Sequence, residues 1–139
     1  MTIRIATIDD EEFLVAHRRH IDADMMKEKI ARRHVYVAES DDQIVGWARY
    51  GLFWDNLPFL NMIHVLDDHR KRGIGSALMD VWERDMADHG FPMVLTSTQS
   101  DEDAQHFYRK LGYVDCGVLL LPDEAGELIL MKRLKPAEQ

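Results

Sequence analysis

The sequence is poor in cysteine and has no long apolar run. Its single cysteine, Cys116, excludes an internal disulfide, and its place in the apolar run CGVLLL predicts a buried, unreactive thiol. Nowhere do about 18 apolar residues follow one another, and the amino terminus has no apolar stretch after a basic cluster. We therefore expect no membrane insertion and no export, and a cytoplasmic protein.

Basic residues are also scarce. Seventeen Lys and Arg against 25 Asp and Glu give a formal net charge of −8. Such a field repels nucleic-acid phosphates, so no nucleic-acid partner is expected. It favours a cationic partner such as an amine, although an acidic surface that serves solubility is the simpler interpretation. The length of 139 residues, without repeats or low-complexity tracts, predicts one globular domain over residues 1–139.

Apolar periodicity predicts an α/β chain in the order β, α, α, β, β, β, α, β, α, β, β. Strands are expected at 2–7, 34–39, 43–53, 59–66, 93–98, 113–121 and 127–134. Helices are expected at 10–33, broken near residues 20–22, and at 76–89 and 101–111. The apolar strand 59–66 has the pattern of a central strand covered on both faces, and a turn with Asp55, Asn56 and Pro58 precedes it. Asp101 is expected to cap the last helix.

A basic segment with two glycines, RKRGIG at residues 70–75, joins the strand 59–66 to the helix 76–89. A diphosphate needs several N–H donors at close range. Glycine lets the backbone approach, and a first helical turn supplies unpaired N–H groups and the positive end of the helix dipole. Leu78 in the third glycine position argues against a dinucleotide fingerprint, and the Gly-Lys-Ser or Gly-Lys-Thr of a P-loop is absent. Taken alone, the segment supports equally a phosphate site and a tight turn with solvated basic side chains.

A second motif further along the chain fits the pattern A-x-x-F-Y-x-K-x-G-[FY]. The matching residues are Ala104, Phe107, Tyr108, Lys110, Leu111, Gly112 and Tyr113. Together with R-x-x-G-x-G at Arg70, Gly73 and Gly75, this motif resembles the GCN5-related N-acetyltransferase (GNAT) family, and the element order fits that family from end to end. The resemblance implies a single-domain GNAT fold: a mixed, mostly antiparallel central sheet with a splayed pair of parallel strands, flanked by helices.

The resemblance also implies where acetyl-CoA binds. It would lie between the splayed strands 59–66 and 93–98, with its pyrophosphate on the turn at 70–75. Its pantetheine arm would pair with the backbone at 63–65, and the N–H of Val65 would act as an oxyanion donor. The residues so implied to bind the cofactor are Ile63, Val65, Arg70, Lys71, Arg72, Gly73, Ile74, Gly75 and Ser76. No metal is expected.

Tyr108 matches the family's usual general acid, which protonates the departing CoA thiolate. The alternative is a core aromatic residue packed beside Phe107. Neighbouring side chains on a helix point in different directions. We therefore favour catalysis for Tyr108 and a core position for Phe107.

The base is less well defined. Many family members have Glu or His where this chain has Asn61, and an amide is not a base. Asn61 would instead hold a relay water, and His64 or a carboxylate would accept the proton of the ammonium. In the other route, the neutral fraction of a less basic amine binds directly. His64 has the opposite strand parity to Asn61, which favours a packed or partly exposed histidine. His64 and Trp54 are the candidates for acceptor contacts.

The resemblance implies transfer of acetyl from acetyl-CoA to a primary amine by direct attack, with Cys116 dispensable. The acceptor is a small-molecule amine or a protein amine, and the sequence does not choose between them. Dimers are frequent in the family, so a homodimer is one assembly open to this chain. The alternative, motivated by Asn61, is a CoA-binding sensor or interaction module that has lost catalysis; the retained Tyr108 argues against it.

Overall fold

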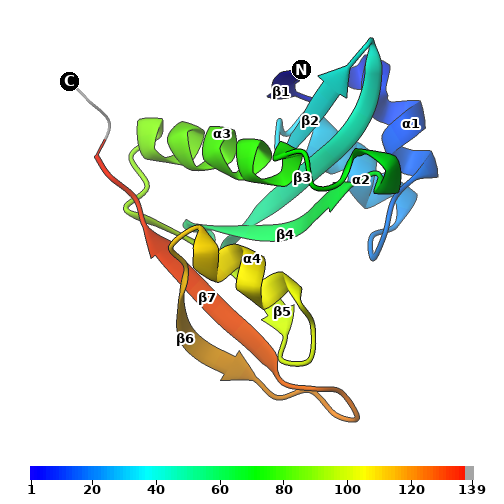
Figure 1. The fold of residues 1–139 in the computed structure, drawn as a ribbon. Helices are drawn as coiled ribbons and strands as arrows, with labels where there is room; N and C mark the ends of the chain where they lie inside the picture. Colours follow the sequence, from blue (N-terminus) through cyan, green and yellow to red (C-terminus); the bar gives the residue numbers. More distant parts are fainter. Residues whose placement is uncertain (137–139) are drawn as a thin grey trace. The chain divides into compact units, whose positions relative to one another are not determined.

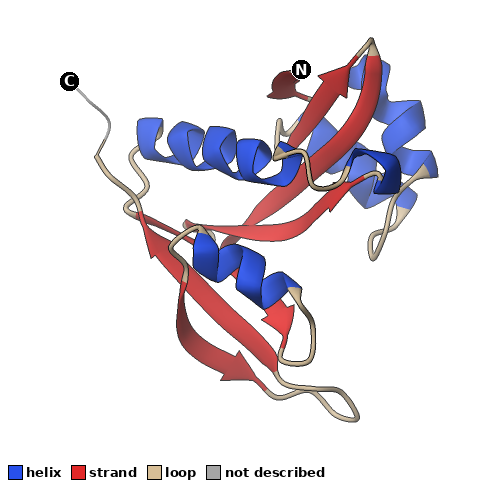
Figure 2. Cartoon of the chain, viewed as in Figure 1, coloured by secondary structure: helices blue, strands red, loops and turns tan. Residues whose placement is uncertain are grey.

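The computed structural model describes residues 1–136 (Figure 1, Figure 2). Its strands are β1 (Thr2–Ile5), β2 (Val35–Ser40), β3 (Gln43–Phe53), β4 (Leu57–Val65), β5 (Met93–Gln99), β6 (Val114–Leu119) and β7 (Glu127–Arg133). Its α-helices are α1 (Glu11–Ala16), α2 (Ala23–Ala31), α3 (Ile74–Asp88) and α4 (Ala104–Lys110), with short 3-10 helices η1 (Ile8–Asp10) and η2 (Asp67–His69). The predicted order of strands and α-helices is confirmed.

The described strands follow the order β1-β2-β3-β4-β5-β7-β6. β1–β2, β2–β3, β5–β7 and β6–β7 are antiparallel pairs, whereas β4 and β5 pair in parallel at Phe59–Leu95 and Leu60–Thr96. The prediction of a mixed, mostly antiparallel sheet is therefore confirmed. The chain divides into two compact units: unit 1 comprises residues 1–50 and 62–81, and unit 2 comprises residues 51–61 and the chain from Trp82 onwards. That they form one domain stays a prediction.

The core of unit 1 follows the two-residue period of its strands. On one face, Val35, Val37 and Trp47 pack against Leu14 of α1 and Met26 of α2. On the other face lies the amino-terminal half of α3. It approaches β3 at Gly46, where an added Cβ would lie 3.1 Å from the His64 carbonyl oxygen and 3.3 Å from Ile74 Cγ2. A glycine is needed here because larger residues would push α3 away from the strand.

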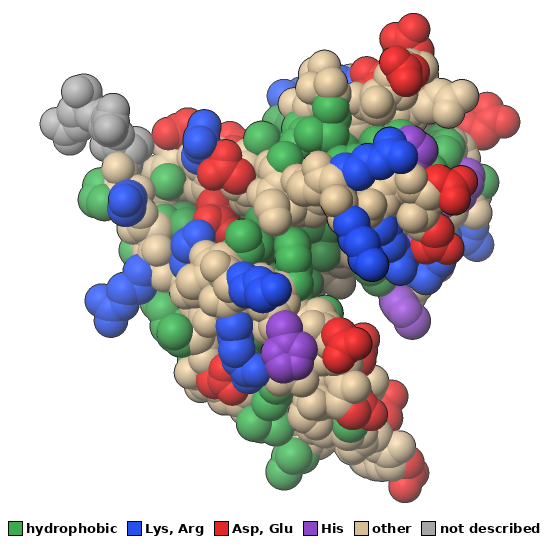
Figure 3. Space-filling model, in the orientation of Figure 1, with side chains coloured by type: hydrophobic (Ala, Val, Ile, Leu, Met, Phe, Trp, Pro, Cys, Tyr) green, Lys and Arg blue, Asp and Glu red, His purple; other side chains and the backbone are tan. Residues whose placement is uncertain are grey.

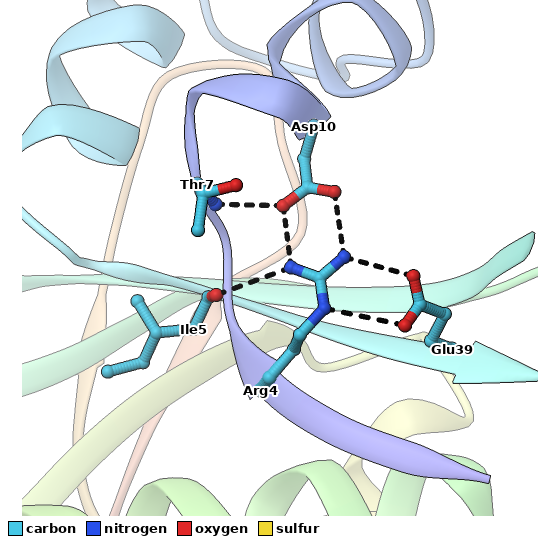
Figure 4. A network of polar contacts seen from close by, with 5 residues as sticks. All are labelled: Arg4, Ile5, Thr7, Asp10 and Glu39. Atoms are coloured by element: carbon cyan, nitrogen blue, oxygen red, sulfur yellow. Dashed lines mark hydrogen bonds and ion pairs between the residues drawn. The ribbon is translucent and has the colours of Figure 1, made fainter. Parts of the chain in front are cut away.

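A polar network fixes the beginning of the chain to unit 1 (Figure 4). Arg4 Nη1 and Nη2 donate to the two Asp10 carboxylate oxygens at 2.7 and 2.9 Å, and Nη2 also donates to Glu39 Oε1 at 3.0 Å. The Thr7 N–H donates to Asp10 Oδ2 at 2.8 Å. The guanidinium of Arg4 holds the pKa of the Asp10 carboxyl below its ordinary value. The network thus ties β1 to η1 and β2.

Unit 2 is built on β5, β7 and β6, with α4 against β5. Tyr108 of α4 and Tyr113 are both buried, with ring centroids 5.8 Å apart. Glu83 of α3 accepts hydrogen bonds from the Tyr113 hydroxyl at 2.9 Å and from Lys132 Nζ at 2.7 Å. This ion pair and hydrogen bond connect α3, β7 and the end of α4 within the unit.

Three elements begin two or three residues away from the sequence predictions. β4 begins at Leu57, so Pro58 lies in the strand and not in the turn. α3 begins at Ile74, two residues earlier than expected. α4 begins only at Ala104, and the prediction that Asp101 caps it is wrong: Asp103 holds the N-cap position, without a side-chain cap hydrogen bond.

Two burial predictions also fail. β4 is buried only at Pro58 and Leu60, the part that includes its parallel pair with β5; Asn61 is exposed and the rest is half-buried. Cys116 is exposed instead of buried. It lies on β6, which stands at the end of the order of described strands, and every residue of β6 is exposed.

Candidate functional site

The turn between β4 and α3 has an unusual backbone. Lys71 has φ +63° and Gly73 has φ +78°, both in the left-handed region. A Cβ added at Gly73 would meet no atom within 4 Å, so the backbone here faces open space. The Gly73 carbonyl accepts from the Ala77 N–H at 3.0 Å and starts the helix. The N–H groups of the next residues have no partner within an α-helix, so they are available to an anion.

Arg70 secures the end of β4. Its Nε donates to the Val65 carbonyl oxygen at 3.2 Å, and its Nη2 lies 3.1 Å from Asp67 Oδ1. The side chains of Arg70, Lys71 and Arg72 remain exposed. Three exposed cations, an open glycine backbone and the start of a 15-residue helix fit a diphosphate group. The structure thus brings the predicted turn residues together with Val65 in unit 1.

His64 lies in an aromatic group on the same unit. Its ring centroid is 5.0 Å from that of Trp47, which in turn lies 5.7 Å from Phe13 and 6.1 Å from His17. Burial lowers the pKa of His64 below its ordinary value, and the positive charges of Arg19 and Arg70 lower it further. The imidazole is therefore neutral near pH 7 and able to accept a proton.

Tyr108 occupies the buried side of α4 in unit 2. It is 6% exposed and hydrogen-bonded to Thr96, whose hydroxyl donates to the Leu60 carbonyl oxygen at 3.2 Å. Burial raises the pKa of Tyr108, the Thr96 hydrogen bond lowers it, and the charges of Glu102 and Glu127 raise it. Its ring centroid is 5.3 Å from that of Phe107, which is half-buried. The prediction that Phe107 is the core residue of this pair is wrong.

Asn61 and Trp54, the remaining predicted site residues, also belong to unit 2, and both are exposed. Trp54 is 76% exposed in the turn between β3 and β4, where it has φ +56° and Asp55 has φ +61°. Its ring centroid lies 4.6 Å from that of Phe53. A tryptophan in the left-handed region is uncommon and marks the turn as a candidate contact surface.

Sequence reasoning missed one charged residue. Arg49 lies within β3 and is only 4% exposed. Its Nη2 donates to the Arg19 carbonyl oxygen at 2.7 Å, whereas its Nη1 has no hydrogen-bond partner. The available signal was an arginine inside the β-rich run QIVGWARYGLF, because charged residues are rarely fully buried unless they are paired.

The described residues, 1–136, hold neither a metal-ligand cluster nor a membrane-spanning helix. Among these residues, no group of three or more His, Cys, Asp or Glu side chains is placed to hold a metal ion. Within the same range, every helix is too short or too polar to span a bilayer.

The sequence and the fold were then compared with known proteins. A family model described as Acetyltransferase (GNAT) family matches residues 3–113. No curated protein matches the chain.

Solved structures share the fold over almost the whole chain. Ard1 from Thermoplasma volcanium is 19% identical, with a TM-score of 0.83 over 96% of this chain and 97% of that chain. The ribosomal-protein-alanine N-acetyltransferase from Brucella melitensis is 22% identical, with a TM-score of 0.81 over 96% of this chain and 100% of that chain. An aminoglycoside 6′-N-acetyltransferase complexed with coenzyme A is 18% identical, with a TM-score of 0.78 over 100% of both chains. At these identities the likeness shows the fold.

Proposed function

Because the chain belongs to the acetyltransferase (GNAT) family, we propose that it transfers an acetyl group from acetyl-CoA to a primary amine by direct attack. The amine nitrogen attacks the thioester carbonyl carbon, a C–N bond replaces the C–S bond, and CoA leaves as its thiol. The reaction needs an anion site for the donor, a hydrogen-bond donor for the carbonyl oxygen, a base for the ammonium and an acid for the thiolate.

The turn between β4 and α3 holds the donor. Its fit to a diphosphate comes from the open backbone at Gly73 and the exposed cations Arg70, Lys71 and Arg72. The binding segment continues through Ile74, Gly75 and Ser76 at the start of α3, and through Ile63 and Val65 at the end of β4. The Val65 N–H serves as the oxyanion donor, and Arg70 holds that residue in place through its carbonyl oxygen.

The state of Tyr108 is the observation that carries the proposal. A tyrosine phenol is protonated at neutral pH, and burial raises the pKa of Tyr108 further, so its hydroxyl carries a proton. A protonated donor is what a departing thiolate requires. A buried tyrosine with a single role in packing would not need the hydroxyl, whereas this one keeps its hydrogen bond to Thr96.

The base must remove a proton from the ammonium of the acceptor. An alkyl ammonium with a pKa of about 10.4 requires about 4.6 kcal/mol for deprotonation at pH 7. His64, neutral at this pH, accepts that proton. Asn61 is exposed and holds the relay water or the amine itself, and Trp54 contributes to the acceptor surface. The amine belongs to a small molecule or to a protein.

Release of free thiol from acetyl-CoA tests this function. Purified protein is incubated with acetyl-CoA and a panel of amines, and at least one amine should support thiol release. Tyr108→Phe should lower kcat about 100-fold or more while acetyl-CoA still binds in a direct titration.

Tyr113→Phe is the matched control. It removes a buried phenol that donates to Glu83, so it should lower stability and leave kcat nearly unchanged. Binding of acetyl-CoA without thiol release from any amine would favour a sensor instead. Equal kcat in Tyr108→Phe and wild type would remove Tyr108 from the mechanism.

A further inference from the structure

Arg49 carries a buried charge that the protein leaves uncompensated. Its Nη2 donates a hydrogen bond to the Arg19 carbonyl oxygen, whereas Nη1 is buried without a partner among the described residues. Burial alone lowers the pKa of Arg49; no carboxylate of the described chain acts to raise it. A buried cation without a counter-charge costs several kcal/mol. A bound anion would offset that cost.

The neighbours of Arg49 add positive charge. Lys29 of α2 donates to the Tyr50 carbonyl oxygen at 2.8 Å. Its pKa is lowered by burial first, and then by the charges of Arg49 and Arg32. The Nδ1 of His34 is buried without a partner, and the pKa of His34 is lowered by burial and by Lys29 and Arg32. The lowered pKa leaves His34 neutral near pH 7, so Lys29 and Arg49 carry the positive charge of this group. Lys29, His34 and Arg49 together are defined here as the cationic cluster.

Little negative charge opposes the cationic cluster. The pKa of Lys29 is raised only by Glu28, and that carboxylate already pairs with Arg32 at 2.6 Å. In a chain of net charge −8, a buried arginine beside a half-buried lysine needs a specific explanation. Figure 3 shows Lys and Arg side chains at several places on one face of the protein, with Asp and Glu side chains among them.

The cationic cluster lies on the same unit as the proposed base. Arg49 and Trp47 are two residues apart on β3, so their side chains share one face of the strand. That face carries the contact between Trp47 and His64. Arg19 links the two places, because its carbonyl accepts from Arg49 while its charge lowers the pKa of His64. An anion at Arg49 would therefore belong to a molecule that also reaches the base.

We propose that the cationic cluster binds an oxyanion of the acceptor, so that the acceptor is a primary amine that also carries a carboxylate or a phosphate. This inference rests on the proposed function, because His64 must act on the same molecule. Arg49 supplies the charged hydrogen bonds through Nη1, and Lys29 adds charge beside it. The bound oxyanion provides the counter-charge that the fold lacks.

Matched acceptors test the proposal. Each amine of the panel is offered as a pair: an amino acid and its amide, or an amino alcohol phosphate ester and its free alcohol. For the best acceptor, the anionic member should have a KM at least about tenfold lower than its neutral counterpart. Whether the acids or the phosphate esters show this preference identifies the oxyanion.

Variants assign the preference to Arg49. Arg49→Gln should remove the difference between the members of a pair, and Arg49→Lys should keep part of it. Lys27→Gln, which removes an exposed cation of α2 in the same unit, is the control and should retain the wild-type preference. If Arg49→Gln fails to fold, Lys29→Gln takes its place and should reduce the preference. Equal use of both members by the wild-type protein would overturn the proposal.

A binding measurement keeps the proposal separate from the proposed function. Malonate and inorganic phosphate are added to the protein without acetyl-CoA, and the Tm is recorded. At least one of them should raise the Tm of the wild type, and should raise that of Arg49→Gln less. If no amine is acetylated, this result still decides whether the oxyanion site exists. If Arg49→Gln weakens binding of CoA and leaves dephospho-CoA unchanged, the cluster holds the donor's phosphate and the proposal is wrong.

Discussion

Two groups of basic side chains interrupt the acidic character of this protein, and they differ in burial. In the turn before α3, the Arg70 side chain is 56% exposed, whereas Arg49 of the cationic cluster is 4% exposed. An exposed charge keeps its water and costs the fold little, so many roles can account for it. A buried, unpaired charge is costly and needs a specific partner. Burial therefore makes Arg49 the more informative of the two about a ligand.

The largest expected effect concerns His64, the proposed base, whose pKa is lowered by burial and then by the charges of Arg19 and Arg70. His64→Gln should lower kcat/KM at pH 7 by about 100-fold, because the ammonium then loses its base. Steady-state thiol release measures this change. His17→Gln, in the same aromatic group, should cost far less. Equal losses in both variants would contradict the assignment of His64 as the base.

A smaller effect on stability separates the buried charge from the exposed one. Arg49→Met removes an unpaired buried cation and keeps much of its apolar volume, so the free energy of unfolding without ligand should rise by ~1–4 kcal/mol. Arg70→Gln should change it much less. Urea denaturation measures both. A destabilised Arg49→Met protein would mean that the hydrogen bond to the Arg19 carbonyl outweighs the buried charge.

The pH dependence tests which arginine acts on His64. The positive charge of Arg70 lowers the pKa of His64, and Arg49 does not contribute to that shift. A base must be neutral, so activity falls as the pH drops through this pKa. Arg70→Gln should therefore move the acid limb of the kcat/KM profile to higher pH, and Arg49→Gln should leave it in place. If the acid limb of the Arg70→Gln profile stays where it is in the wild type, the charge of Arg70 does not act on the group that this limb reports.

The smallest expected effect is that of Cys116. Its thiol is exposed, but partial desolvation and the Asp115 carboxylate raise its pKa, which lowers the thiolate fraction. Cys116→Ala should keep wild-type kcat and KM in the thiol-release assay. Loss of turnover with acetyl-CoA still bound would replace direct attack with a covalent intermediate.

Local patterns in the sequence were sufficient for most of the architecture. The alternation and apolar periods predicted every strand and α-helix in order. Gly90 and Gly112, with φ +88° and +97°, follow α3 and α4, where glycine commonly ends a helix. The basic turn at 70–75 is likewise local, because strand, glycines and helix start are contiguous in the chain.

Properties that depend on distant segments were not predictable. Cys116 reads as buried because its neighbours are apolar, yet only the strand order reveals that β6 pairs on one side alone. In the sequence, Arg49 is one polar residue within a strand pattern. Only the structure shows that its neighbours are Lys29 and the Arg19 carbonyl and not a carboxylate. Such relations are set by tertiary packing and leave no periodic signal.

One kinetic comparison tests the central claim most directly, namely that the exposed turn holds the donor and the buried cluster holds the acceptor. KM is measured for acetyl-CoA and for the best anionic acceptor in wild type, Arg70→Gln and Arg49→Gln. Arg70→Gln should raise the KM for acetyl-CoA and leave that for the acceptor, and Arg49→Gln should do the reverse. If both variants raise the same KM, or if neither variant changes either KM, the two basic regions do not divide the substrates between them.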